Sequence, residues 1–134
     1  MINVTVYNET DVRRIPRTSL TTVVSAVCTG EGITEAVIRI ILVSDDEIHR
    51  INREYLQHDY PTDVITFPIE ESPLEGEIYI SIDTAMMQAT DYQVSLKNEL
   101  MRLSAHGALH LAGYDDDTPE KRRLMSELET KYMA

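Results

Sequence analysis

The sequence predicts an α+β fold of about four strands and five helices, in a single domain spanning residues 1–134. Strand patterns occupy the first two thirds of the chain, whereas three helix patterns follow one another after residue 82. This order favours an α+β arrangement over strictly alternating α/β units. A hydrophobic content of 43% over 134 residues is enough for one sizeable core.

Four segments carry a strand pattern: 2–7, 36–43, 63–69 and 77–82. Segment 2–7 alternates apolar and polar residues, which is typical of a half-buried strand. Segment 36–43 is the most apolar and β-branched run, so we expect it at the centre of the sheet. Pro73 and Gly76 predict a turn before the last strand.

Two helices are expected between these strands. The first covers residues 18–29 and is closed by Gly30 and Gly32. The second begins with Ser44 followed three residues later by Glu47, which is the pattern of a capping box. Its expected apolar stripe consists of Ile48, Ile51 and Tyr55.

Three more helices complete the chain. Asp83 is expected to cap a helix that runs to about Tyr92, and Ser95 to cap the next. Thr118–Glu120 combines a cap residue, a proline and an acidic residue, as at the start of a last helix. The expected core-facing residues are Leu96, Leu100, Leu103 and Leu109 in the helix after Ser95, and Leu124, Met125, Leu128 and Tyr132 in the last helix.

Charge and cysteine content narrow the possible functions. The formal net charge of −11 disfavours general binding to nucleic acid, so RNA would need local basic patches. Such patches are Arg13, Arg14 and Arg17, then Arg50 and Arg53, then Lys121, Arg122 and Arg123. A lone Cys28 in an apolar stretch predicts a buried thiol and no disulfide. With no long apolar run and no leader pattern, we expect a cytoplasmic protein without a membrane partner.

A metal site is predicted at His106 and His110, which lie one helical turn apart and so face the same side. Gly113 can end the helix in a left-handed conformation and turn the chain back, which brings Asp116 toward the same ion. Three protein ligands with an open fourth position are typical of catalytic zinc, Zn²⁺. Other candidates for the third ligand are Asp115, Asp117, His49 and His58.

The same residues also have a purely structural interpretation, as two hydrogen-bonded core histidines followed by a solvated acidic loop. In the catalytic interpretation, zinc lowers the pKa of its bound water, with His106 and His110 as essential ligands. Zinc proteases place a glutamate directly after the first histidine, and here Gly107 occupies that position. Asp63 is the candidate general base, although it is equally suited to cap a turn.

Three segments resemble the YbeY family of bacterial endoribonucleases: His106–Asp115, Asn52–Pro68 and Gly76–Ser81. The resemblance implies a zinc-dependent, single-strand-specific endoribonuclease that matures ribosomal RNA and associates with the small ribosomal subunit. It also implies a mixed sheet flanked by helices, with a zincin-like helix carrying the metal ligands. RNA is therefore the expected substrate, and DNA is not.

The chain departs from the family pattern at two positions. Asp116 stands where the family commonly has a third histidine, a mild change because carboxylates also bind zinc. Leu56 stands where the family has an arginine, whose planar fork suits a phosphate. Arg53 or His58 are the candidates to bind substrate in its place.

Two other functions fit parts of the sequence. The spacing His-x-x-x-His-x-x-Gly-x-x-Asp is that of long zinc-protease motifs, so a zinc metallopeptidase is one alternative. A ribosome assembly factor with a structural metal and no catalysis is the other, supported by Leu56 and the acidic surface.

Overall fold

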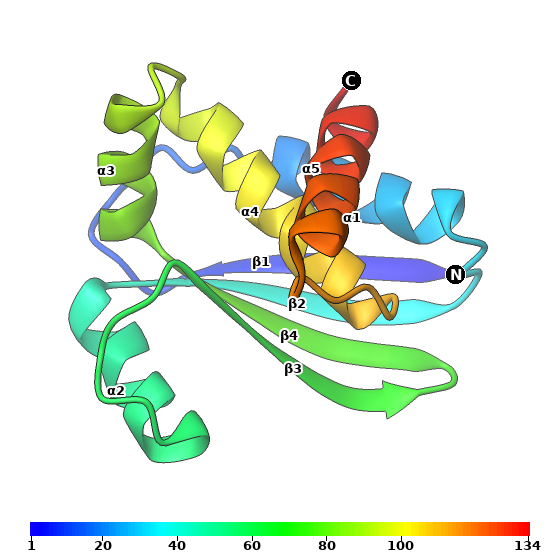
Figure 1. Ribbon diagram of the computed structural model, residues 1–134, viewed down its shortest axis with the longest axis horizontal. Coiled ribbons are helices and arrows are strands. Elements are labelled where there is room, and N and C mark those ends of the chain that lie inside the picture. Colours follow the sequence, from blue (N-terminus) through cyan, green and yellow to red (C-terminus); the bar gives the residue numbers. More distant parts are fainter.

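The computed structural model describes all residues, 1–134, and has the expected order of strands and helices (Figure 1). The elements are β1 (Ile2–Asn8), α1 (Arg17–Gly30), β2 (Ala36–Val43), α2 (Asp45–Leu56), β3 (Val64–Glu71), β4 (Leu74–Ser81), α3 (Ile82–Asp91), α4 (Leu96–Leu111) and α5 (Pro119–Met133). The predicted α+β class is therefore confirmed. No helix combines the length and the apolar character needed to cross a bilayer.

The sheet is mixed, with strand order β1-β2-β4-β3. β1, β2 and β4 run parallel, whereas β3 pairs antiparallel with β4 across the hairpin at the sheet edge. β2 is internal, as its apolar sequence predicts. Because β3 is an edge strand, the loop that precedes it can approach the helices above the sheet.

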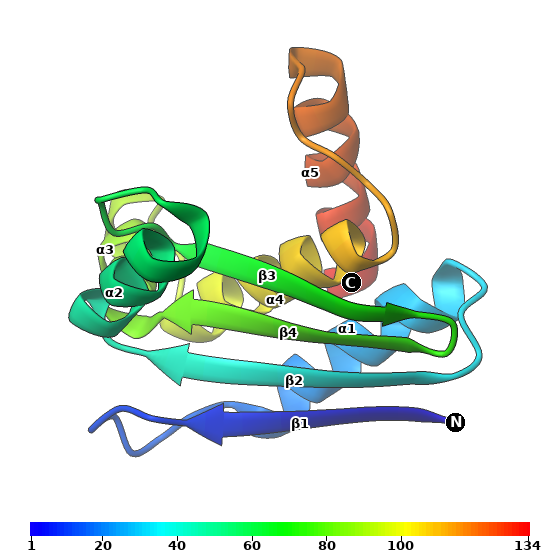
Figure 2. The same ribbon diagram turned by 90° about the horizontal axis from the view of Figure 1, so that it is seen from below.

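Helices cover the two faces of the sheet unequally. α1, α4 and α5 lie over one face, while the other face carries only α2 at one end, as the view from below shows (Figure 2). The main core lies under α1 and α4, where alternate β2 residues such as Ile38 and Ile40 are fully buried. α4 therefore runs across the sheet with one face in the core and the other free to carry chemistry.

Hydroxyl side chains cap three helices at the predicted positions. Ser44 accepts from the Glu47 backbone N–H, Ser95 from that of Asn98 and Thr118 from that of Lys121. Each satisfies one of the free N–H groups of a first turn. The predicted capping box is only half formed, because the Glu47 carboxylate accepts from the Arg50 guanidinium instead.

The start of α3 differs from the prediction. Ser81, rather than Asp83, caps this helix by accepting from the Thr84 backbone N–H. Asp83 lies in the first turn, and its carboxylate accepts from the Asp45 backbone N–H at 2.8 Å. Asp83 thus accepts a hydrogen bond from a free backbone N–H group in the first turn of α2. This role depends on the contact between α2 and α3.

Gly76 is not part of a turn, because the hairpin turns at Ser72 and Pro73 and Gly76 lies inside β4. A Cβ at Gly76 would stand 2.6 Å from the Leu111 side chain, so glycine lets α4 pack closely on the strand. Two expected core residues are also exposed: Tyr55 on α2 and Leu124 on α5. The start of α5 projects away from the sheet, which leaves Leu124 without a partner layer (Figure 2).

Candidate metal centre

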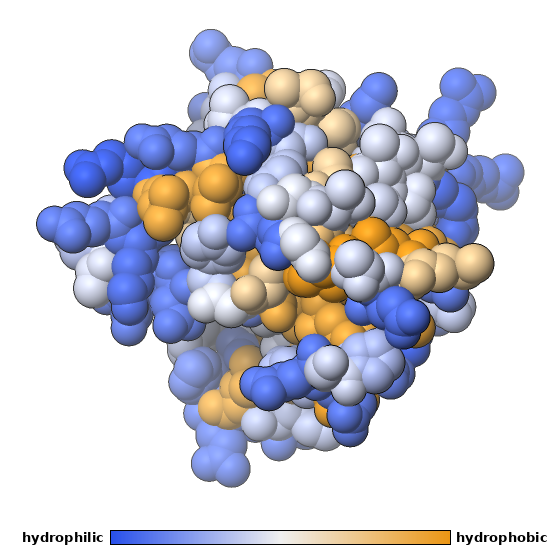
Figure 3. Space-filling view, turned by 90° about the vertical axis from the view of Figure 1, so that its right-hand side faces the viewer, coloured by the Kyte–Doolittle hydropathy of each residue, from blue (hydrophilic) through white to orange (hydrophobic).

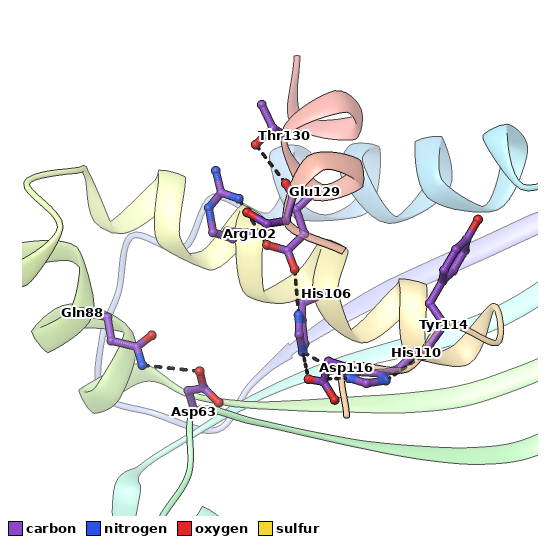
Figure 4. Close-up of polar contacts among 10 residues, drawn as sticks. Asp63, Gln88, Arg102, His106, His110, Tyr114, Asp116, Glu129 and Thr130 are labelled. Atoms are coloured by element: carbon purple, nitrogen blue, oxygen red, sulfur yellow. Dashed lines mark hydrogen bonds and ion pairs between the residues drawn. The ribbon is translucent and has the colours of Figure 1, made fainter. Parts of the chain in front are cut away.

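The helix α4 presents His106 and His110 on the side that faces β3 and the loop before β3 (Figure 4). Its opposite side is held in the core by Leu100 and Leu109, both fully buried. Gly107 packs directly on β4, where an added Cβ would stand 2.6 Å from Ile78. Zinc proteases have a glutamate at this position. Here only glycine fits, because α4 contacts the sheet at Gly107.

The end of α4 turns the chain back as predicted. Gly113 has φ +109°, its N–H donates to the His110 carbonyl, and the Tyr114 N–H donates to the Leu109 carbonyl. These two bonds are the pattern of a Schellman motif, which glycine favours. Arg122 of α5 donates to the Asp116 backbone carbonyl at 3.2 Å and so ties the returning loop to the last helix.

His106, His110 and Asp116 converge on one point. The two Nε2 atoms lie 3.1 Å apart, and Asp116 Oδ2 lies 3.3 Å from His106 Nε2 and 3.4 Å from His110 Nε2. Ligands about 2.0–2.2 Å from a tetrahedral zinc ion stand roughly 3.3–3.6 Å from one another. The triangle of donor atoms therefore has close to the size that a small divalent cation requires, and no other group of His, Cys, Asp and Glu side chains does.

The hydrogen bonds of the two rings show that lone pairs face this point. His106 Nδ1 lies 2.7 Å from Glu129 Oε2, and His110 Nδ1 donates to the Tyr114 carbonyl at 2.9 Å. In a neutral ring with its proton on Nδ1, Nε2 is unprotonated. Two nitrogen lone pairs and a carboxylate then meet within 3.4 Å, which is repulsive unless a cation or a proton lies between them. The donor set thus fits a bound metal.

Burial and charge act on His106 in opposite directions. Burial of the ring lowers its pKa and is the largest single effect, but the carboxylates of Glu129, Asp116 and Asp63 together raise the pKa above the ordinary value of 6.5. The site is therefore strongly negative around an imidazole. This field favours a cation at the triad.

The triad lines a cleft of about 330 Å³ between α4, the end of α2 and the loop before β3. Asp63 and His58, two of the predicted site residues, line the same cleft, and so does Leu56. The His58 ring stacks on Tyr60 with 5.3 Å between ring centroids. Arg53 does not line the cleft, and its guanidinium lies 3.8 Å from the Asp59 carboxylate.

The alternative third ligands are turned elsewhere. His49 Nε2 lies 2.8 Å from Asp59 Oδ1, and Asp117 pairs with Lys121 at 3.1 Å. Asp115 is exposed and does not join the triad. The structure thus brings Asp116, and none of these residues, to the two histidines.

A larger groove, of about 600 Å³, lies elsewhere, between the start of β2, the β3–β4 hairpin and the end of α4. Apolar residues, including Ile33, Leu74 and Leu111, contribute to its lining, and apolar side chains gather near the middle of this end of the molecule (Figure 3). It contains no histidine or cysteine, so it offers none of the nitrogen or sulfur ligands of a zinc site.

Sequence reasoning missed the residues behind the triad. Glu129 of α5 is buried, and its second oxygen lies 3.2 Å from Arg102. Glu99 of α4 is also buried, and its Oε1 has no hydrogen-bond partner. The sequence does hold a signal for Glu129. This residue follows Met125 by one helical turn, so it lies on the apolar face of α5 that packs on the core.

Comparisons with known proteins point to one family. The family model described as Endoribonuclease YbeY matches residues 4–134. A protein named Endoribonuclease YbeY from Chlorobium phaeobacteroides (strain DSM 266) is 44% identical, over 96% of this chain and 90% of its own. Its namesake from Chlorobaculum tepidum is 43% identical, over 96% and 93%. The solution structure of TM1509 from Thermotoga maritima superposes with a TM-score of 0.66 at 31% identity, over 99% of this chain and 87% of that one.

Proposed function

Because this chain belongs to the YbeY family of endoribonucleases, we propose that it hydrolyses single-stranded RNA with the help of a zinc ion held by His106, His110 and Asp116. The observation that carries the proposal is the convergence of two imidazole Nε2 atoms and one carboxylate oxygen, which lie 3.1, 3.3 and 3.4 Å from one another. A set of two nitrogens and one oxygen favours zinc, although other divalent transition metals accept the same ligands.

In this proposal the protein positions the metal ion and also accepts a proton during the reaction. A divalent cation, when bound, supplies Lewis acidity toward a phosphodiester and toward water. His106 and His110 hold it with rings that are fixed at Nδ1, so little rearrangement is needed. Asp63 lines the cleft with the triad, and we assign to it the role of accepting a proton from the attacking water.

The wall of the cleft suits a flexible strand of RNA. The stacked rings of His58 and Tyr60 offer an aromatic surface on which an unpaired base can lie. We assign substrate binding to His58, and to Arg53 only through rotation of its exposed side chain toward the cleft. Ribosomal RNA undergoing maturation with the small ribosomal subunit, in the cytoplasm, is the substrate that the family resemblance implies.

The two alternative functions are tested by particular residues. A zinc metallopeptidase needs a carboxylate after the first histidine, and the packing of Gly107 on Ile78 leaves no room for one. A binding factor without catalysis is favoured by Leu56, which is 41% exposed and lines the cleft where the family has an arginine.

One assay separates these functions. The purified protein is incubated with labelled single-stranded ribosomal RNA, with the same RNA in duplex form and with casein. Each reaction is run as purified, with chelator, and with chelator followed by zinc. Elemental analysis of the same preparation identifies the bound metal, and the double variant His106→Ala, His110→Ala controls for contaminating nucleases.

The endoribonuclease proposal expects internal cuts in single-stranded RNA that stop with chelator and return with zinc. Cuts in casein would support the peptidase. RNA binding without any cut would support the assembly factor. RNA cuts that persist in chelator or in the double variant would overturn the proposed metal chemistry.

A further inference from the structure

Glu129 links the last helix to the metal centre through two contacts. One carboxylate oxygen lies 2.7 Å from His106 Nδ1, and the other lies 3.2 Å from Arg102. The residue is only 6% exposed, so its charge is removed from water (Figure 4). A buried carboxylate is costly unless it is paired, and here both of its oxygens have partners.

We propose that Glu129 is a positioning residue of the metal centre, which keeps the proton of His106 on Nδ1 and so leaves the Nε2 lone pair free for the metal. This inference rests on the proposed function only in taking the triad as the metal site. Its effect is exerted through His106, because Glu129 is not one of the residues whose donor atoms converge.

The surroundings of His106 Nε2 explain why such a residue is needed. A proton on Nε2 would find two acceptors at once, since His110 Nε2 lies 3.1 Å away and Asp116 Oδ2 lies 3.3 Å away. The metal-free triad therefore favours the wrong tautomer. A charged acceptor at Nδ1 opposes this, because hydrogen bonds to carboxylates are stronger than those to neutral groups.

The two histidines are held unequally. His110 Nδ1 donates to the neutral carbonyl of Tyr114, which belongs to the turn that ends the same helix. His106 is held by the carboxylate of Glu129, which lies on α5, 23 residues further along the chain. The metal centre is therefore completed only when α5 packs on α4, through the buried Met125 and Glu129.

The test compares variants of the full chain in two measurements. The first is the ¹⁵N spectrum of the histidine rings in metal-free protein at alkaline pH, which reports which nitrogen carries the proton. The second is Co²⁺ affinity, by competition with a chromophoric chelator. The variants are Glu129→Ala and Glu129→Gln, with Glu127→Gln as matched control, since Glu127 is an exposed residue of the same helix without an ion pair.

We expect Glu129→Ala to move the His106 proton toward Nε2, to leave His110 unchanged, and to weaken Co²⁺ binding by about 10- to 100-fold. Glu129→Gln keeps the volume but offers only a neutral oxygen, so its effect should be intermediate; it also serves if the alanine variant does not fold. Glu127→Gln should match the wild type in both measurements.

Arg102→Gln separates positioning from a merely structural ion pair. It removes the other partner of Glu129 but leaves the contact with His106, so the tautomer should stay on Nδ1 even if stability falls. The proposal is overturned if folded Glu129 variants keep both the wild-type tautomer and the wild-type Co²⁺ affinity. Neither measurement uses RNA, so they stand whatever the outcome of the cleavage assay.

Discussion

The two walls of the cleft are built differently. On the α4 wall, each metal-facing ring has its Nδ1 held, His106 by Glu129 and His110 by Tyr114. On the other wall, the loop between α2 and β3 carries exposed His58, and beside it Arg53 points toward Asp59. One wall is thus set in advance by buried partners, whereas the other is free to adjust.

This difference matches what each wall is proposed to bind. A metal ion tolerates displacements of only a few tenths of an ångström in its ligands, so supports behind them matter as much as the ligands. Single-stranded RNA presents many conformations, and stacking on an exposed ring does not require a fixed position. Mutations on the two walls should therefore have effects of different size, and they should change different measured quantities.

The largest effect is expected at the α4 wall. Replacing one ligand, in His106→Ala or His110→Ala, should lower single-turnover RNA cleavage by about 10³-fold or more, or at least about 4 kcal/mol of transition-state stabilisation. Metal-free His110→Ala should be at least as stable as the metal-free wild type, because the crowding of donor atoms is relieved. His106→Ala should lose stability, because it leaves one oxygen of buried Glu129 without its partner. A variant that keeps within tenfold of the wild-type rate would exclude the triad as the catalytic metal site.

Asp63 ends the loop of the other wall, directly before β3, and Asp63→Asn should come second. Loss of a general base commonly costs about 10²- to 10⁴-fold. The rate should fall while Co²⁺ affinity stays unchanged, since Asp63 is not one of the converging ligands. Equal losses of metal affinity and rate would instead place Asp63 among the supports of the metal.

Gly107→Ala probes how the α4 wall is seated on the sheet. The new Cβ would stand 2.6 Å from Ile78, a stiff β-branched residue of the internal strand β4. We expect about 1–3 kcal/mol of destabilisation by urea unfolding, reduced somewhat by the better helix propensity of alanine. Unchanged stability together with unchanged metal affinity would show that the close contact is not needed to seat the histidines.

The adjustable wall should respond more weakly. His58→Ala removes a stacking ring and should raise KM for single-stranded RNA by roughly 5- to 10-fold, about 1 kcal/mol, with little change in kcat. Arg53→Gln is the matched variant on the same helix end, and its effect should be smaller because the side chain lies outside the cleft. If Arg53→Gln has the larger effect, the Arg53 side chain must leave Asp59 and turn into the cleft when RNA binds.

The smallest effect concerns Glu99, buried behind the α4 wall. Burial raises its pKa, nearby Arg102 lowers it, and Asp63 and Glu129 raise it further, so the folded pKa lies above the ordinary value of 4.5. The folded state then holds this proton more tightly than the unfolded chain, and stability falls as pH rises past 4.5 until the folded pKa is passed.

Glu99→Gln removes this dependence. Relative to the wild type, the variant should gain on the order of 1 kcal/mol between acidic and neutral pH, measured by urea unfolding at several pH values. If the difference in unfolding free energy between the two proteins is the same at every pH, then burial does not raise the pKa of Glu99.

Local patterns in the sequence determined the order of the elements and the metal ligands. Ser95 caps α4, His106 and His110 share one face, and Gly113 turns the chain so that Asp116 returns to them. All of this follows from the helical repeat and from the backbone freedom of one glycine, which act over a few residues.

Only the tertiary structure decided which residues support that site. Glu129 and Arg102 lie 27 residues apart, Asp83 satisfies a different helix from its own, and Gly107 is explained by a strand beneath it. These contacts depend on how α4, α5 and β4 pack. Spacing along one helix shows which way a side chain points, but the element that it meets is set by the folding of distant segments onto a common core.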